Sequence, residues 1–125
     1  MKKTFKKEER LKSTKLIESL MKDGRSIHAA PLKLVWMEVK TDMRFPAQTT
    51  VAVSKRNFKR AVDRNKLKRR MREAFRNNKQ PLYDVLKEKK KKITIMFFHV
   101  AKEMSDQSLI TNGMIRSIEK LQAAL

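Results

Sequence analysis

One segment, residues 55–76, constrains the fold of this chain more than any other. It contains 11 Lys and Arg residues but only two acidic residues, Asp63 and Glu73. If the segment is placed on a helix at about 100° per residue, its apolar residues fall on one side: Leu67, Met71, Ala74 and Phe75. The spacing therefore predicts a helix over about residues 60–77 that packs through one face and presents cations on the other.

The whole chain is also strongly basic. Its 125 residues include 32 Lys and Arg against 13 Asp and Glu, which gives a net charge of +19. Such a surplus repels itself in the folded state, and like charges at i,i+4 oppose helix formation. Phosphates along the helix would relieve both effects, because guanidinium groups hold phosphate oxygens with two hydrogen bonds and binding releases counterions. The pattern therefore predicts a polyanionic partner.

Electrostatics alone leaves three kinds of polyanion-binding protein open. They are a subunit of an RNA enzyme, a ribosomal or other structural RNA-binding protein, and a DNA-binding helix module. A DNA-binding protein would more often show the spacing of a helix-turn-helix motif or the apolar pattern of a dimerisation interface, and the sequence shows neither. Binding to a membrane surface is disfavoured because the apolar face of the basic helix is narrow and is needed for the core.

Apolar periodicity predicts the other elements. We expect a helix between Ser13 as its N-cap and Gly24 at its C-terminal end. Strands are expected at residues 32–39 and 49–53, paired antiparallel because the connection between them is short.

The second half of the chain is expected to contain one more strand and one more helix. After Pro81, which disfavours continuation of the basic helix, residues 82–92 read as a polar connector. Residues 93–100 read as a strand buried on both faces, and residues 110–125 as an amphipathic helix. The predicted fold is α+β, a two-layer α/β sandwich of order α-β-β-α-β-α, with a basic arm at 1–10 and a single polyanion-binding domain at 11–125, which becomes an RNA-binding domain if the resemblance described below holds.

The sequence offers no sign of a protein-borne active site. There is no cysteine, and the two histidines, His28 and His99, do not have the spacing of a metal site. We therefore expect no catalytic residue, no metal ligand and no cofactor bound by the protein. The longest apolar run, 93–100, is too short to span a membrane, and no apolar stretch follows the basic N-terminus as in a signal peptide. A cytoplasmic location is expected.

Residues 53–75 closely resemble the signature of the bacterial ribonuclease P protein family. The core of the resemblance is Arg64-Asn65-Lys66-Leu67-Lys68-Arg69, followed by Arg72-Glu73-Ala74-Phe75. Weaker similarity at Arg10-Leu11-Lys12 and at Val100-Ala101-Lys102 extends it over about residues 8–121. The motif is long and specific, so it favours the RNA-enzyme subunit over the two alternatives.

The resemblance implies a fold like the second domain of ribosomal protein S5, with a left-handed β-α-β crossover. It implies an endoribonuclease subunit that helps to remove the 5′ leader of precursor tRNA and binds the catalytic RNA 1:1. Mg²⁺ and the hydrolysis then belong to the RNA. Contacts with RNA would fall on the motif helix and the basic loop before it: Lys55, Arg56, Lys59, Arg60, Arg64, Asn65, Lys66, Lys68, Arg69, Arg72 and Arg76.

The family also holds the leader in a cleft between the first helix and the sheet, and here the sequence departs from the pattern. Many members offer aromatic rings from the first helix, whereas Ile17 and Met21 stand at those positions. The candidate cleft residues are Ile17, Met21, Val35 and Trp36. For Ile17, Met21 and Trp36, packing in the core is an equal alternative. We therefore expect leader contacts that are van der Waals in nature, or that come from Trp36.

Overall fold

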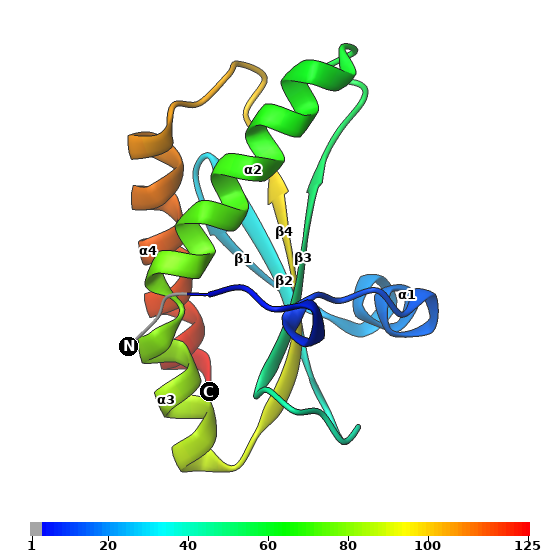
Figure 1. Ribbon diagram of the computed structural model, residues 1–125, viewed down its shortest axis with the longest axis vertical. Coiled ribbons are helices and arrows are strands. Elements are labelled where there is room, and N and C mark those ends of the chain that lie inside the picture. The colour runs from blue at the N-terminus through cyan, green and yellow to red at the C-terminus, as the bar shows by residue number, and fades with distance from the viewer. Residues whose placement is uncertain (1–3) are drawn as a thin grey trace.

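The computed structural model describes residues 4–125 as a sheet with helices on both faces (Figure 1). In chain order the elements are a short 3₁₀ turn η1 (Lys7–Glu9), α1 (Thr14–Asp23), β1 (Arg25–Ala29), β2 (Leu32–Val39), β3 (Ala47–Val53), α2 (Ala61–Asn78), α3 (Gln80–Lys89), β4 (Lys92–His99) and α4 (Gln107–Ala124). Figure 1 shows α2, α3 and α4 on one side of the sheet and α1 on the other. This is the predicted α+β class, and the predicted order holds with three elements added: η1, β1 and α3.

The strand order is β1-β2-β4-β3. β2 pairs antiparallel with β1 and with β4, whereas β3 runs parallel to β4. The expected pairing of β2 with β3 is therefore wrong, because β4 lies between them. The connection from β3 to its parallel neighbour β4 carries α2 and α3, so the basic segment of the sequence forms a crossover on one face of the sheet.

Besides the short turn η1, two elements, β1 and α3, were not predicted from the sequence. β1 forms the edge of the sheet, where the residues on its inner face pair with Leu32, Leu34 and Trp36 of β2. α3 replaces most of the expected polar connector at 82–92. Pro81 lies in the first turn of α3, where the missing N–H of proline costs nothing, so it ends α2 and also begins the next helix.

The main core lies between the sheet and the layer of α2, α3 and α4. Alternation along β2 directs Leu32, Leu34 and Trp36 into this core. From α2 come the four residues that the periodicity predicted: Leu67, Met71, Ala74 and Phe75. A smaller cluster on the opposite face joins α1 to the sheet through Leu11, Leu20 and Val35.

α1 has the two ends that the sequence predicted. The Ser13 hydroxyl accepts a hydrogen bond from the backbone N–H of Leu16 at 3.2 Å, as in an N-cap. At the other end, the N–H of Gly24 donates to the carbonyl of Leu20. A Cβ on Gly24 would collide with that carbonyl and with the Val35 side chain. Glycine is needed here because the chain turns from α1 into β1 directly against the sheet.

The first residues of the chain pack against the domain. The predicted arm covers 1–10, of which residues 1–3 lie outside the described part of the chain. Figure 1 shows the following segment crossing in front of the sheet toward α1. Phe5 packs edge-on against Phe75 of α2, with ring centroids 5.7 Å apart, and the N–H of Leu11 donates to the carbonyl of Thr49 at 2.9 Å. Residues 4–10 are thus part of the folded domain.

A buried charged cluster anchors this segment. Glu9 is 1% exposed, forms an ion pair with Lys79 at the α2–α3 junction, and accepts a hydrogen bond from the Tyr83 hydroxyl at 2.6 Å. Burial by itself raises the pKa of Glu9, but hydrogen bonds from Lys79, Tyr83 and the Lys6 N–H outweigh it, so the net pKa is lowered from 4.5. The carboxylate is therefore held in its charged form.

No helix within residues 4–125 is both long enough and apolar enough to cross a membrane.

Candidate nucleic-acid interface

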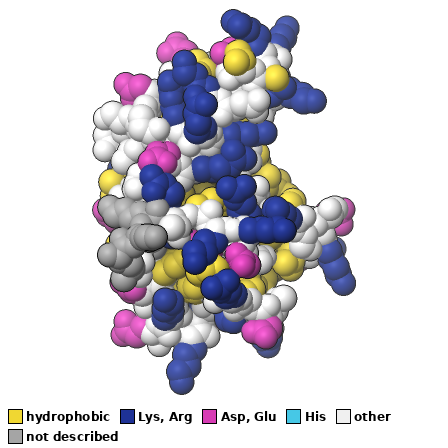
Figure 2. Space-filling model, in the orientation of Figure 1, with side chains coloured by type: hydrophobic (Ala, Val, Ile, Leu, Met, Phe, Trp, Pro, Cys, Tyr) yellow, Lys and Arg dark blue, Asp and Glu magenta, His cyan; other side chains and the backbone are white. Residues whose placement is uncertain are grey.

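The outer face of α2 is the predicted cationic row. Asn65, Lys66, Arg69 and Arg72 are exposed, while Lys68 and Arg76 are partly buried. The buried side of the same helix is formed by the four apolar residues named above. The helix phase predicted from the sequence is therefore confirmed, and Figure 2 shows dark-blue side chains over much of the length of α2 and onto the N-terminal segment.

The loop between β3 and α2 continues this surface. Lys55, Arg56, Lys59 and Arg60 are all exposed on it. The loop is held at its centre by Phe58, which is 7% exposed and packs edge-on against His99 at 5.5 Å between ring centroids. The N–H of Phe58 donates to the Ser54 carbonyl at 3.1 Å. The four cations are thus presented by an anchored turn.

Some of the residues predicted to contact RNA form hydrogen bonds or ion pairs within the protein. Arg64 donates from one terminal nitrogen to the carbonyls of Phe58 and Lys59, both at 2.8 Å. Arg76 forms an ion pair with Glu73 at 2.5 Å, and this contact raises the pKa of Arg76 and lowers that of Glu73. Arg70, which flanks the row, donates to the Ser105 carbonyl at 2.7 Å. The guanidinium of Arg64 therefore links the basic loop to α2 and is not free on the outer face of the helix.

Replacing Arg64 by Ala is expected to lower the free energy of unfolding by about 1–3 kcal/mol, because two backbone carbonyls lose a charged donor. Arg69→Ala is the matched control, since Arg69 is exposed on the same helix, and its effect should stay within about 0.5 kcal/mol. Urea unfolding followed by circular dichroism measures both. Equal stability of the two variants would contradict the structural role of Arg64.

The remaining cations of the interface lack acidic partners. Within residues 4–125, no ion pair involves the following side chains of the loop and α2: Lys55, Arg56, Lys59, Arg60, Lys66, Lys68, Arg69 and Arg72. Three acidic residues near the surface pair with other cations: Glu8 with Arg44 at 3.0 Å, Glu9 with Lys79 and Glu73 with Arg76. Asp63, in the first turn of α2, takes part in no ion pair within residues 4–125. The interface therefore concentrates positive charge that the protein does not neutralise, as expected for a surface that binds phosphates.

The candidate leader residues divide between the two faces of the sheet. Val35 is buried beneath α1, Ile17 packs partly buried against the same small cluster, and Met21 is 54% exposed. Trp36 lies on the opposite face, in the main core and 6% exposed, so core packing is the correct alternative for it. The guanidinium carbon of Arg25 lies over the Trp36 ring, 5.8 Å from the ring centroid.

Phe98 is a ring on the α1 side that the sequence reasoning missed. It is partly buried and packs against the cluster of Leu11, Leu20 and Val35, and its strand neighbours are Lys33 of β2 and Ala52 of β3. The signal was present in the alternation of 93–100: Ile93, Ile95, Phe97 and His99 face the main core, so Phe98 must face the other way.

Among the described residues, 4–125, no group of three or more His, Cys, Asp or Glu side chains is placed to hold a metal ion.

Comparison with known proteins identifies relatives along most of the chain. The ribonuclease P family model matches residues 5–121. The ribonuclease P protein component of Porphyromonas gingivalis (strain ATCC 33277) is 34% identical over 115 residues, covering 92% of this chain and 84% of the relative. That of Chlorobium phaeobacteroides is 39% identical over 101 residues, covering 78% of this chain and 69% of the relative.

Solved structures share the fold. The ribonuclease P protein of Thermotoga maritima superposes with a TM-score of 0.65 at 23% identity, covering 94% of this chain and 97% of that protein. The Staphylococcus aureus protein gives a TM-score of 0.63 at 24% identity, with 90% and 94% covered. At these identities the superpositions support the architecture, and the sequence relatives carry the family assignment.

Proposed function

Because the chain belongs to the ribonuclease P protein family, we propose that it binds the ribonuclease P RNA through the loop 54–60 and the outer face of α2. The observation that carries this proposal is the set of α2 cations without acidic partners in residues 4–125, on a helix whose other face is used by the core: Lys66, Lys68, Arg69 and Arg72. A rigid helix presents charges at fixed spacing, so binding phosphates along it costs little conformational entropy. We further propose one protein per RNA, in the cytoplasm.

In this proposal the RNA carries the hydrolysis of the phosphodiester bond, together with the Mg²⁺ that assists it. The protein contributes binding and position. Its cations offset the repulsion between the RNA subunit and precursor tRNA, both of which are polyanions.

We place the 5′ leader of precursor tRNA on the surface formed by α1 and the face of the sheet that α1 covers. Ile17 and Met21 border this surface from α1, Val35 lies beneath the helix, and Phe98 supplies a ring from β4. Phe98 takes the role first considered for Trp36, because a base can stack only on a ring that reaches the surface. Lys33, beside Phe98 in the sheet, is placed to meet a leader phosphate.

Precursor tRNA is expected to bind the assembled enzyme more tightly than mature tRNA, because only the precursor has a leader. The gain should grow over the first leader nucleotides and then level off when the surface is filled. Phe98→Leu should remove about 1 kcal/mol of the gain, near the low end of a stacked base, and Phe45→Leu, on the β2–β3 connection, serves as the matched control. Equal affinity at every leader length would leave the protein as a structural RNA binder with no substrate role.

A further inference from the structure

His99 is the last residue of β4, and it lies beside the start of the basic loop. It pairs with Val53 of β3, after which the loop 54–60 begins, and it is only 2% exposed. Its ring packs edge-on against Phe58, the residue that anchors the loop. A buried histidine therefore touches the centre of the loop that we assign to RNA binding.

A hydrogen bond connects the same ring to the segment between β4 and α4. The Nε2 atom of His99 is hydrogen-bonded to the Ser105 hydroxyl at 2.8 Å, and Ser105 is also 2% exposed. The Ser105 carbonyl accepts a hydrogen bond from Arg70 at 2.7 Å, and the Gln107 side chain donates to the Arg70 carbonyl at 2.9 Å. His99 is thus linked through Ser105 to the middle of α2.

These contacts form a closed ring with the basic loop. Arg64 of α2 donates to the carbonyl of Phe58, and the Phe58 ring packs on His99. From His99 the contacts return to α2 through Ser105 and Arg70. One set of side chains therefore fixes both the loop and the first half of α2 against the end of the sheet.

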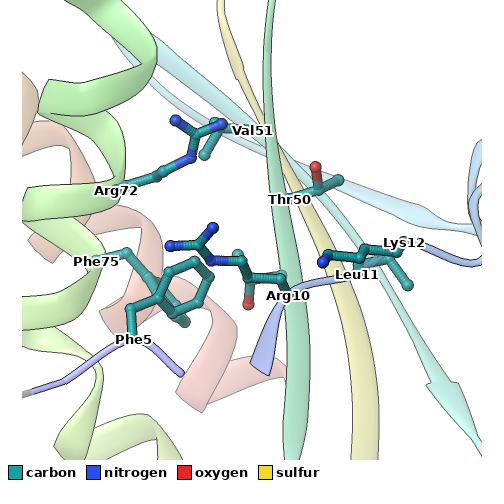
Figure 3. A pocket seen from close by; sticks show the side chains of 9 residues that line it. Phe5, Arg10, Leu11, Lys12, Thr50, Val51, Arg72 and Phe75 are labelled. Carbon is teal, nitrogen blue, oxygen red and sulfur yellow. The ribbon is translucent and has the colours of Figure 1, made fainter. Parts of the chain in front are cut away.

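The second half of α2 is held by a different contact. Figure 3 shows the Phe5 ring of the N-terminal segment beside Phe75 of α2, and the two ring centroids are 5.7 Å apart. Phe75 lies about three helical turns beyond Arg64. This contact fixes the far end of the helix, so the loop depends on the contacts around His99.

Packing alone does not explain a histidine at position 99. Within residues 4–125, the buried Nδ1 atom of His99 has no hydrogen-bond partner, which costs free energy that an apolar side chain would not cost. Burial also lowers the pKa of His99, so the ring is neutral at neutral pH. The hydrogen bond from the ring to Ser105 is the feature that histidine adds to this part of the core.

We propose that His99 is a positioning residue of the RNA interface, which holds the loop 54–60 in the shape that meets RNA phosphates; this inference rests on the function proposed above. The loop carries four exposed cations: Lys55, Arg56, Lys59 and Arg60. These charges repel each other, so a released loop would spread them apart. A loop that is fixed before binding loses less conformational entropy when its cations meet phosphates.

The first test follows the loop without RNA. Native-state hydrogen exchange is measured at the amide of Phe58, which donates to the Ser54 carbonyl. His99→Leu removes the ring and the hydrogen bond, whereas Ser105→Ala removes only the hydrogen bond, and we expect exchange about tenfold faster in both. Ile118→Val, a buried position farther along α4, should leave exchange at Phe58 unchanged. Wild-type exchange in both loop variants, or equal acceleration in Ile118→Val, would overturn the proposal.

The second test asks whether the fixed loop matters for binding RNA. The affinity for ribonuclease P RNA is measured over a salt series, and in His99→Leu the log–log slope should lose about 1.4–1.8 of its magnitude, the share of two phosphate contacts. A variant that is only less stable has fewer folded molecules, but these bind with the wild-type slope, as we expect for Ile118→Val.

The two tests fail in distinguishable ways. Faster exchange at Phe58 in His99→Leu together with an unchanged slope would overturn the positioning role, because the RNA would then not need the loop to be held. A wild-type protein that does not bind the RNA at all would contradict the proposed function, whereas the effect of His99 on the exchange of the loop would stand.

Discussion

Raising the salt concentration from about 50 to 200 mM is expected to weaken binding to ribonuclease P RNA on the order of 10³–10⁴-fold. The loop 54–60 and α2 present cations with no acidic partner in the protein, and we expect about eight of them to meet phosphates, which gives a log–log slope of about −6 to −7. Each contact releases counterions, and added salt opposes that release. Filter binding or fluorescence anisotropy over a salt series measures the slope.

Paired charge removals locate the surface responsible for this slope. Lys66→Gln/Arg69→Gln removes two exposed cations from α2 and should reduce the magnitude of the slope by about 1.4–1.8. Lys87→Gln/Lys89→Gln removes the same charge from α3, which Figure 1 places away from the start of α2, and should leave the slope near that of wild type. Equal reductions in both pairs would show that only net charge matters and would contradict a defined surface.

Replacing Lys79 by Met is expected to lower the free energy of unfolding by about 3–5 kcal/mol, because it leaves the Glu9 carboxylate buried without its countercharge. Glu9 is almost inaccessible to solvent and would retain only the hydrogen bonds from Tyr83 and the Lys6 N–H. Chemical unfolding at neutral pH measures the loss. Wild-type stability in this variant would contradict the buried pair.

Two further variants show whether the loss of stability comes from breaking the Glu9–Lys79 pair or from the loss of any lysine. Lys87→Met on the exposed side of α3 should change stability by less than about 0.5 kcal/mol. Glu9→Met/Lys79→Met should recover part of the loss, because removing both charges leaves no isolated ion. In the wild type the pKa of Glu9 is lowered from 4.5, so the stability that it contributes is present above about pH 4.5 and is lost as the pH falls through the lowered value.

The elements that were predictable from the sequence are those with a strong local signal. The strand at Leu32–Val39 is found with the predicted bounds, and α2 begins and ends within one residue of prediction. β1 lacks such a signal, because it is short and polar. It pairs with β2, which follows it after two residues, and it is held from far along the sequence by α4, from which Lys120 donates to the carbonyl of His28 at 2.8 Å.

α3 shows a different reason for a missed element. Leu82, Tyr83 and Leu86 are buried at helical spacing, so the periodicity was present. Pro81 was interpreted only as the end of one helix, although proline is equally suited to the first turn of the next.

The candidate site was predictable where it depends on one helix and not where it depends on tertiary contacts. The exposed row of α2 follows from its periodicity alone. The assignment of Trp36 required knowing which face of β2 meets the larger helical layer, and the strand order that decides this is not local. The docking of the N-terminal segment depends on Glu9 meeting Lys79, 70 residues away, and nothing in the pattern of residues 1–10 indicates that contact.

Cleavage of precursor tRNA at low magnesium concentration tests the central claim most directly. The purified protein is added to a bacterial ribonuclease P RNA, and release of the 5′ leader is followed. With few magnesium ions to screen the two RNAs, the protein's cations should have their largest effect. We predict cleavage at the leader junction when protein and RNA are both present, little with the RNA alone, and none with the protein alone. No stimulation by the protein, or cleavage by the protein without RNA, would contradict the account.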